Sequence, residues 1–208
     1  MATARFTLFI SVVLVAAACS SSGTSSTTSA PQADPISIPN EGGSLEGHTP
    51  TAFAGTGTGL FVGDNLNPSF PEGVGVQLYL TFVLPSGLSA GIARIASNAL
   101  QVAGTPFEDL GPLLVEPVSY ESFGPDLFDL PSIGPQAECT ITSDTSIECD
   151  VTSAVQGAID RGDETAQFRI RFTQFADGDG QQDLAMFFRS DSNSNEAGVF
   201  ELTVEPGS

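Results

Sequence analysis

Residues 76–84 read VQLYLTFVL, and every even-numbered position in this stretch is a large apolar residue. Two of the four odd-numbered positions, Gln77 and Thr81, are polar. Successive side chains of a β-strand point to opposite faces, so this period of two predicts a strand with one buried face. Residues 85–87 (PSG) are typical of a turn and are expected to end the strand.

Similar patterns on both sides of this strand predict an all-β protein. Residues 168–172 (FRIRF) and 200–204 (FELTV) alternate in the same way. Weaker strand candidates lie at residues 59–62, 99–103, 113–118 and 184–189. Short strands separated by Gly, Pro, Asn and Asp clusters are typical of an antiparallel β-sandwich, here expected to be a jelly roll.

One short helix is expected at residues 152–161. Val155 and Ile159 would share its buried face, since residues four apart lie on one side of a helix. Asp150 or Thr152 could cap its start, and Gly162 would end it.

The first residues have the pattern of an export signal. Arg5 precedes an apolar run at residues 6–18 that ends in small residues, and Cys19 follows directly. A cysteine in this position resembles the lipobox of bacterial lipoproteins, in which the signal is removed and the cysteine is acylated. The alternatives are a membrane-spanning anchor, for which the run is short, and a signal peptide cut elsewhere. The expected protein is exported and lipid-anchored to the bacterial membrane, facing outside the cytoplasm.

Composition divides the chain into three parts. Residues 1–18 are expected to be the signal peptide, and residues 19–50 the lipidated cysteine with a Ser/Thr-rich tether. Such a polar stretch has too few apolar side chains to offset the entropy of ordering, so the tether is expected to be disordered. Residues 51–208 are sufficient for one core-forming domain, the expected β-sandwich.

The three cysteines indicate one disulfide. If Cys19 carries lipid, Cys139 and Cys149 remain as a pair. A hairpin turning at Asp144 would place them opposite one another, with Ile141 facing Ile147 and Thr142 facing Ser146. Directly opposed residues of antiparallel strands are within disulfide reach, and export favours oxidation. A redox switch or a metal pair is the alternative.

Charge excludes nucleic acid as a partner. The chain has 25 acidic residues against six cationic ones, all arginine, and a formal net charge of −19. Phosphate binding needs clustered cations, which this chain lacks. The acid excess is consistent with cation binding or simply with a highly solvated surface.

Composition also argues against an enzyme. The single histidine, His48, falls in the expected tether, and lysine is absent. Histidine-based triads, Schiff-base chemistry and lysine-dependent phosphate loops therefore lack their key residues. A glycosidase with paired carboxylates remains an open alternative, because the spatial separation of acids is not visible in a sequence.

Residues 177–183 (DGDGQQD) form the best candidate metal site. Calcium prefers six to eight oxygen ligands on a tightly curved loop. Asp177, Asp179 and Asp183 would supply carboxylates, and the backbone carbonyl of Gln181 a fourth ligand. This spacing resembles the core of calcium-binding repeats. The alternative is an acidic turn without an ion.

An ordered set of short motifs resembles a known family. The motifs are at residues 78–88 (LYLTFVLPSGL), 95–102 (IASNALQV), 104–111 (GTPFEDLG), 149–156 (CDVTSAVQ) and 167–172 (QFRIRF). Over residues 59–205 the chain resembles DNRLRE-type domains, jelly-roll modules of secreted bacterial proteins that are grouped with carbohydrate-binding modules. The resemblance implies a non-catalytic module with a polysaccharide ligand. Tryptophan is absent, so Tyr79 and Tyr120 are the candidates for stacking on a sugar, unless a loop covers them.

Two functions are therefore expected. The first is a cell-envelope lipoprotein displaying a binding module for an extracellular glycan, stabilised by calcium. The second is a structural or adhesion protein of the envelope that acts through contacts with other proteins and has no small ligand.

Overall fold

The computed structural model describes residues 26–29, 32–39, 51–52, 60–66, 73–188 and 199–207, with the backbone alone for the first three ranges and for residue 206. Residues 1–18, Cys19 and His48 lie outside these ranges, so the predicted signal peptide and lipidation site lie outside the described residues. None of the helices in the described part is long and apolar enough to cross a bilayer.

Most of the described chain is antiparallel strand, which confirms the all-β prediction. Three N-terminal strands are β1 (Ser26–Ser29), β2 (Gln32–Pro39) and β3 (Thr51–Ala52). The other ten are β4 (Leu60–Asp64), β5 (Val74–Val83), β6 (Ala90–Ser97), β7 (Leu100–Ala103), β8 (Leu113–Val118), β9 (Ala137–Ser143), β10 (Ser146–Asp150), β11 (Thr165–Phe172), β12 (Asp183–Phe187) and β13 (Glu201–Pro206). The helical elements are α1 (Pro106–Asp109), a 3-10 turn (Pro125–Leu127) and α2 (Thr152–Arg161).

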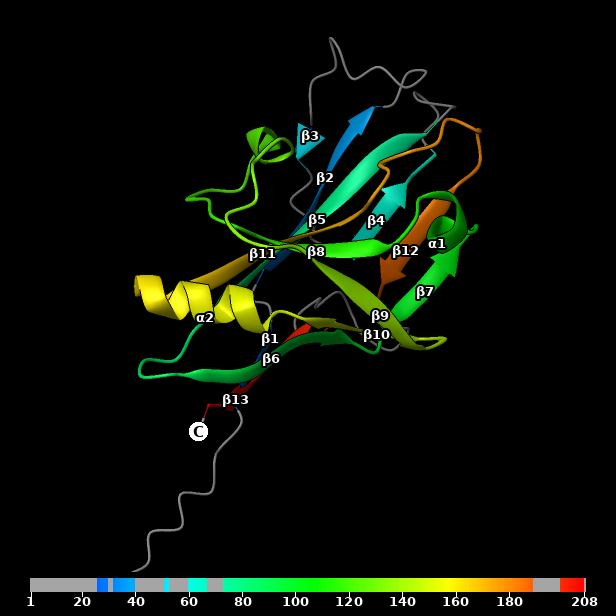
Figure 1. Cartoon of the computed structure of the whole chain (residues 1–208). Coiled ribbons are helices and arrows are strands. Elements are labelled where there is room, and N and C mark those ends of the chain that lie inside the picture. Colours follow the sequence, from blue (N-terminus) through cyan, green and yellow to red (C-terminus); the bar gives the residue numbers. More distant parts are fainter. Residues whose placement is uncertain are drawn as a thin grey trace, which may run out of the picture.

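Hydrogen bonds join the strands in the order β1-β13-β6-β10-β9-β8-β11-β5-β4-β12-β7, and β2 pairs with β5. Strand β9 pairs with both β8 and β10, so the path from one half to the other is continuous. Figure 1 shows the sheet curling, so that β6, β10 and β13 lie beneath β5, β8 and β11. The structure is a curled, half-barrel-like sheet, and the finer assignment to a two-sheet jelly roll stays a prediction.

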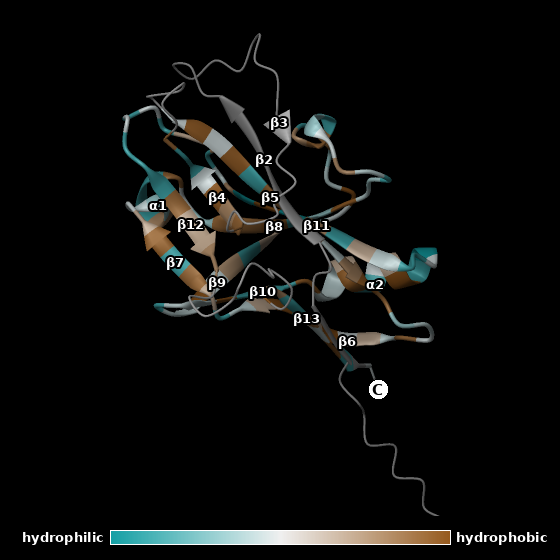
Figure 2. Ribbon diagram, turned by 180° about the vertical axis from the view of Figure 1, so that it is seen from behind, coloured by the Kyte–Doolittle hydropathy of each residue, from teal (hydrophilic) through white to brown (hydrophobic). Residues whose placement is uncertain are grey.

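Apolar side chains from both halves meet in one core. On β5 the even-numbered residues Leu78, Leu80 and Phe82 are fully buried in it, as the alternation predicts. Figure 2 shows apolar and polar residues following one another along this strand. The opposite half contributes Ile95 and Leu202. Packing both halves onto one core explains why the sheet curls.

The described strands differ from the sequence prediction in two places. Strand β6 was not predicted, because its residues AGIARIAS include few large apolar side chains, although Ala93, Ile95 and Ser97 alternate into the interior. Within the predicted tether, β1 pairs with β13 and β2 pairs with β5. The edges of β13 and β5 offer unpaired backbone groups, which these stretches satisfy although their composition predicts disorder.

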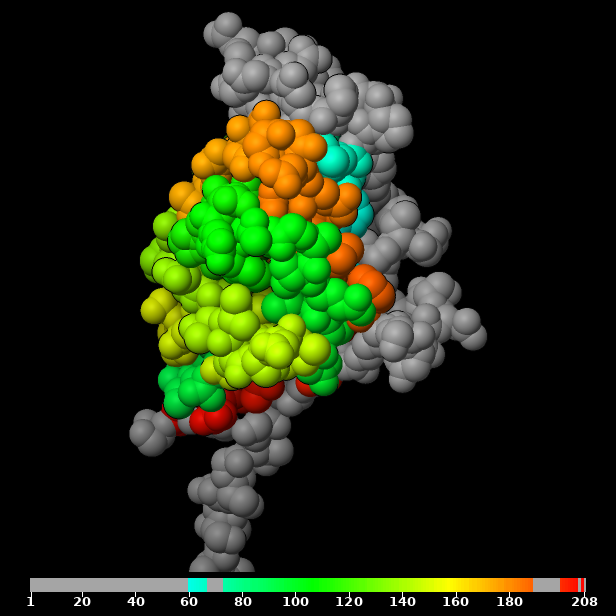
Figure 3. All heavy atoms as spheres, turned by 90° about the vertical axis from the view of Figure 1, so that its right-hand side faces the viewer, coloured from blue at the N-terminus to red at the C-terminus, as the bar shows by residue number. Residues whose placement is uncertain are grey.

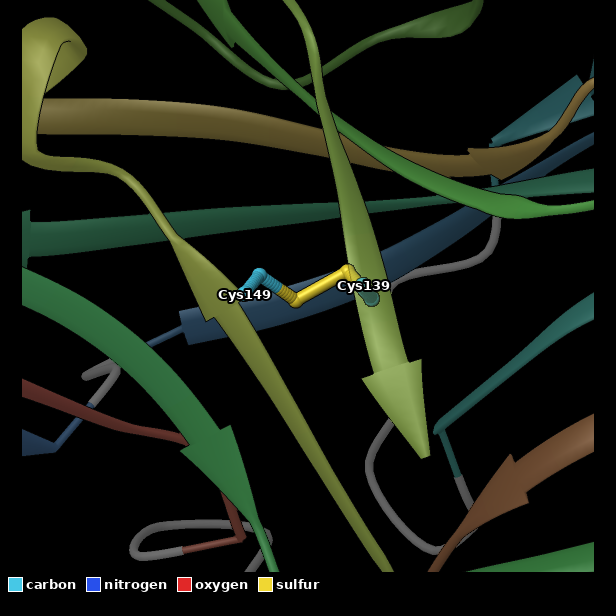
Figure 4. Close-up of a disulfide and its surroundings, with 2 residues drawn as sticks. All are labelled: Cys139 and Cys149. Carbon is cyan, nitrogen blue, oxygen red and sulfur yellow. A yellow bond between two sulfur atoms is a disulfide. The ribbon is translucent and has the colours of Figure 1, made fainter. Parts of the chain in front are cut away.

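Strands β9 and β10 form the predicted hairpin. Cys139 pairs with Cys149 and Ile141 with Ile147, as expected. The predicted pairing of Thr142 with Ser146 is wrong: Ser146 pairs with Ser143 instead, because the register shifts at a bulge. A disulfide joins Cys139 and Cys149, whose Cα atoms are 4.2 Å apart (Figure 4). Closing this short loop stabilises the fold by roughly 2–3 kcal/mol in the entropic model.

Helix α2 has the predicted bounds and packs against the sheet (Figure 1). Val155 is buried on its inner face, and Gly162 ends it with a positive φ of 77°. The carboxylate of Asp150 accepts a hydrogen bond from the backbone N–H of Thr152, so Asp150 satisfies one of the free donors at the helix start.

Candidate metal centre

Three acidic side chains gather at one end of the sheet. Asp109 is the last residue of α1, Asp177 follows β11, and Asp183 begins β12. One carboxylate oxygen of each lies within 4.8 Å of the others. Figure 1 places α1 beside β12, and in Figure 3 the green α1 region adjoins the orange residues that connect β11 to β12. Two segments far apart in the sequence, α1 and the β11–β12 connection, therefore form one acidic cluster.

The backbone at Gly104, just before α1, packs closely against the backbone at Gln182, just before β12. Gly104 has a φ of +72°, and a Cβ added there would lie 2.0 Å from the carbonyl oxygen of Gln182. The next residue, Thr105, donates its backbone N–H to Asp183 Oδ1 at 2.6 Å and its hydroxyl to Asp109 Oδ2. Thr105 thus fixes two of the three carboxylates, and only glycine fits at position 104.

A fourth carboxylate, Asp64, lies beneath this cluster. Asp64 is the last residue of β4 and pairs directly with Asp183 on β12. It is 0% exposed, and among the described residues neither of its carboxylate oxygens has a hydrogen-bond partner. Gly73 packs so closely against it that an added Cβ would lie 1.9 Å from Asp64 Oδ1. Buried polar groups are nearly always hydrogen-bonded, so the described residues leave this carboxylate without the partner that its position requires.

The pKa of Asp64 is raised to about 6, chiefly by burial and also by the negative charges of Asp177 and Asp183. The backbone N–H groups of Asp177 and Val74 partly oppose this pKa shift, without reaching hydrogen-bond geometry. Burial likewise raises the pKa of Asp183, with additional contributions from the charges of Asp109, Asp177 and Asp179. The carboxyl of Asp64 therefore lies close to Asp177 and Asp183. We refer to Asp64, Asp109, Asp177 and Asp183 as the acidic site.

The structure brings together two of the four predicted ligands. Asp177 and Asp183 are neighbours, as predicted. Asp179 is not part of the group, because its carboxylate accepts hydrogen bonds from the backbone N–H and the side-chain amide of Gln181 within the loop. Gln181 is exposed. Sequence reasoning missed Asp64 and Asp109 because they join the site only through the pairing of β4 with β12 and the packing of α1.

The predicted sugar-stacking residues are not on an open face. Tyr79 does lie opposite the core face of β5, but it is only 1% exposed. Its hydroxyl donates to the carbonyl oxygen of Leu127 at 2.6 Å, in the segment that covers it. Tyr120 is half-buried and packs edge-on against Tyr79, with ring centroids 5.9 Å apart. A sugar ring cannot reach the face of Tyr79, so the prediction that this residue stacks on a sugar is wrong. Tyr79 instead belongs to a small second hydrophobic core.

A buried ion cluster holds this covering segment in place. Arg169 donates two hydrogen bonds to Glu116, and further ones to the carbonyl oxygens of Phe128 and Leu130 at 3.2 and 2.9 Å. Arg171 also donates to Glu116, at 2.7 Å. Burial opposes ionisation of Glu116, but these hydrogen bonds and charges outweigh it and lower its pKa. Arg169 and Arg171 therefore have a structural role: both bind Glu116, and Arg169 also binds the covering segment.

No family model matches the chain, and no curated protein matches it. The function therefore has to be argued from the site.

Proposed function

We propose that this chain is an exported, lipid-anchored protein whose domain, of jelly-roll type, is a non-catalytic module that binds calcium at the acidic site. The observation that carries the proposal is the buried carboxylate of Asp64, without a hydrogen-bond partner among the described residues and beside three other carboxylates. An acidic cluster on a surface is common without an ion. A fully buried carboxylate that interacts with two members of the cluster, and has no hydrogen-bond partner among the described residues, is not.

A bound cation would stabilise the ionised carboxylates of the acidic site. Desolvation and neighbouring like charges both disfavour the ionised form of Asp64, and they raise its pKa to about 6. At neutral pH the carboxyl is nevertheless mostly ionised. A bound divalent ion would be the largest local charge, and its attraction would offset both the desolvation of Asp64 and the repulsion from the neighbouring carboxylates.

The chemistry of the donors favours calcium. All four residues offer carboxylate oxygens, which suit hard cations rather than zinc or copper. Calcium accepts six to eight oxygens in flexible geometry, whereas magnesium needs near-ideal octahedral geometry. Carboxylates that come from three separate segments fit the less demanding ion.

The sequence supports the rest of the proposal. The position of Cys19 supports lipid anchoring, and the lack of lysine and the single histidine support a non-catalytic role. The partner would be an extracellular polysaccharide. The runner-up is an envelope protein contact without a small ligand, which burial of Tyr79 favours over a sugar stacked on that ring.

Calcium is expected to stabilise the purified protein against thermal unfolding. A ligand that binds only the folded state at about a hundred times its dissociation constant adds roughly 2.7 kcal/mol. Differential scanning calorimetry in calcium and in chelator should therefore show a rise of several degrees. Isothermal titration should show uptake of one ion.

Three variants make this test specific. Asp177→Asn should abolish the calcium-dependent rise. Asp179→Asn should retain most of it, since Asp179 binds Gln181 rather than facing the site. Asp144→Asn, at the exposed β9–β10 turn, is the matched control and should respond like the wild type. Loss of the response in all three, or in none, would contradict the assignment of ligands.

Lipid anchoring has its own test. The mature protein isolated from membranes should begin at Cys19 and carry the added mass of acyl chains. Two or three chains would hold it stably, since each buried CH₂ contributes about 0.8 kcal/mol. Mass spectrometry of the N-terminal peptide measures this directly, and Cys19→Ser should release the protein from the membrane. An intact leader or an unmodified Cys19 thiol would rule the proposal out.

A further inference from the structure

Resting on the calcium site proposed above, we infer that the bound ion keeps coordination positions open towards solvent, and that these positions bind two adjacent hydroxyl groups of a neutral sugar.

The carboxylate oxygens of the acidic site are too few to complete the coordination of a calcium ion. Asp109 and Asp183 each use one oxygen to accept a hydrogen bond from Thr105, and Asp177 uses one to accept from the backbone of Asp179. Neither oxygen of Asp64 has a hydrogen-bond partner among the described residues. Asp109, Asp177 and Asp183 bring one oxygen each within reach of one another, and even with both oxygens of Asp64 this set falls short of the six to eight that calcium takes, so about one to three ligands would come from elsewhere.

Burial decreases across the acidic site from one side to the other. Asp64 and Asp183 are buried, Asp177 is half-buried, and Asp109 is exposed. An ion held among them is closed off on the side of β4 and β12. The free positions therefore face outwards, past Asp109, over the surface that the α1 region and the β11–β12 connection share in Figure 3.

Charge selects the class of ligand. Four carboxylates exceed the charge of one divalent ion, and Glu108 and Asp179 add exposed acids nearby. An anionic ligand would meet net repulsion, so the incoming oxygens should be neutral. Two adjacent hydroxyls of a sugar ring are neutral and prearranged. They can replace two separate waters without ordering two independent molecules.

Binding of a sugar through the ion is also consistent with the burial of Tyr79. Tyr79 is enclosed by the segment around Leu127, and Tyr120 packs against it. Stacking on the ring of Tyr79 is therefore not available to a sugar. The ion would supply the contact that an aromatic platform supplies in other sugar-binding sites.

Terbium(III), a luminescent substitute for calcium, tests both parts of this inference on the mature protein. Luminescence lifetimes in H₂O and D₂O count the waters bound directly to the ion. We expect about one to three waters in the protein alone. Methyl α-mannoside or methyl α-galactoside should displace up to about two of these waters, one for each hydroxyl. Galacturonate is the anionic control. Calcium-dependent retention on a mannan or galactan column, lost in chelator, should accompany the change.

The outcomes separate this inference from the calcium site itself. No binding of terbium or calcium, or binding that Asp64→Asn leaves unchanged, overturns the site. Binding with no coordinated water overturns the open positions. Coordinated waters that neither sugar displaces, with no retention on either column, overturn the sugar ligand and leave a purely structural ion. Stronger displacement by galacturonate than by the neutral sugars overturns the charge argument. Asp144→Asn should behave as the wild type throughout.

Discussion

Replacing Asp64 by asparagine is expected to raise the stability of the calcium-free protein and to abolish its response to calcium. The folded-state pKa of Asp64 is raised to about 6 from an ordinary value of 3.8, so folding disfavours its ionised form. This penalty is absent below the ordinary pKa, grows as the pH rises towards 6, and is fully present at pH 7.5. Asparagine keeps the size and removes the charge. The expected gain in chelator is about 2 kcal/mol, reduced from the full linkage value because the buried amide is itself unpartnered.

Urea unfolding at several pH values, with and without calcium, measures both effects. In chelator, the wild type should lose stability between about pH 4 and pH 6 relative to Asp64→Asn, and the difference should then stay constant. In calcium the order should reverse, because only the wild type binds the ion. Asp144→Asn again serves as the control, since it removes one exposed acid from a turn. A calcium-free Asp64→Asn protein that is less stable than the wild type would show that Asp64 has a structural partner.

Replacing Arg169 by methionine is expected to destabilise the protein by about 3 kcal/mol, the lower end of the range for removing one partner of a buried ion pair. The change deletes both hydrogen bonds to Glu116 and leaves the carbonyl oxygens of Phe128 and Leu130 without their donor. Glu116 would keep only Arg171. In a domain of this size such a loss lowers the midpoint of thermal unfolding by roughly 10 °C.

Arg161→Met is the matched control for this change. Arg161 pairs with Asp163, but both side chains are largely exposed, so the loss should be under about 0.5 kcal/mol. Amide hydrogen exchange should also separate the variants. Residues 119–135 should exchange faster in Arg169→Met, because the contacts to Phe128 and Leu130 are lost, and should be unchanged in Arg161→Met. Equal effects of the two substitutions, or a more stable Arg169→Met protein, would contradict the role given to Arg169.

The elements that sequence reasoning predicted are those whose signal is local. The alternation around Leu80 and Ile170 marked β5 and β11, and the spacing of Cys139 and Cys149 fixed the hairpin pairing around the disulfide. Gly162 marked the end of α2. Each of these depends on residues within one element or one turn, so a single sequence carries enough information.

The features that sequence reasoning missed depend on contacts between distant segments. Asp64 becomes a partner of Asp183 only when β4 pairs with β12, and Asp109 joins them only through Thr105. The burial of Tyr79 results from a segment almost fifty positions further along the chain, whose carbonyl at Leu127 accepts its hydroxyl. Alternation correctly gave the direction of the tyrosine side chain, but it carries no information about what lies above that face.

The pairing of β13 with β6 has a consequence for the order in which the domain folds. Leu202 and Val204 of β13 are buried in the core, opposite Ile95 and Ala93 of β6, and the whole of β7 to β12 lies between these two strands in the chain. During synthesis the lower half of the sheet therefore lacks a central strand until almost all of the domain has left the ribosome. A chain whose core depends on contacts between strands so far apart in sequence closes that core late, and the export proposed above would require such a delay.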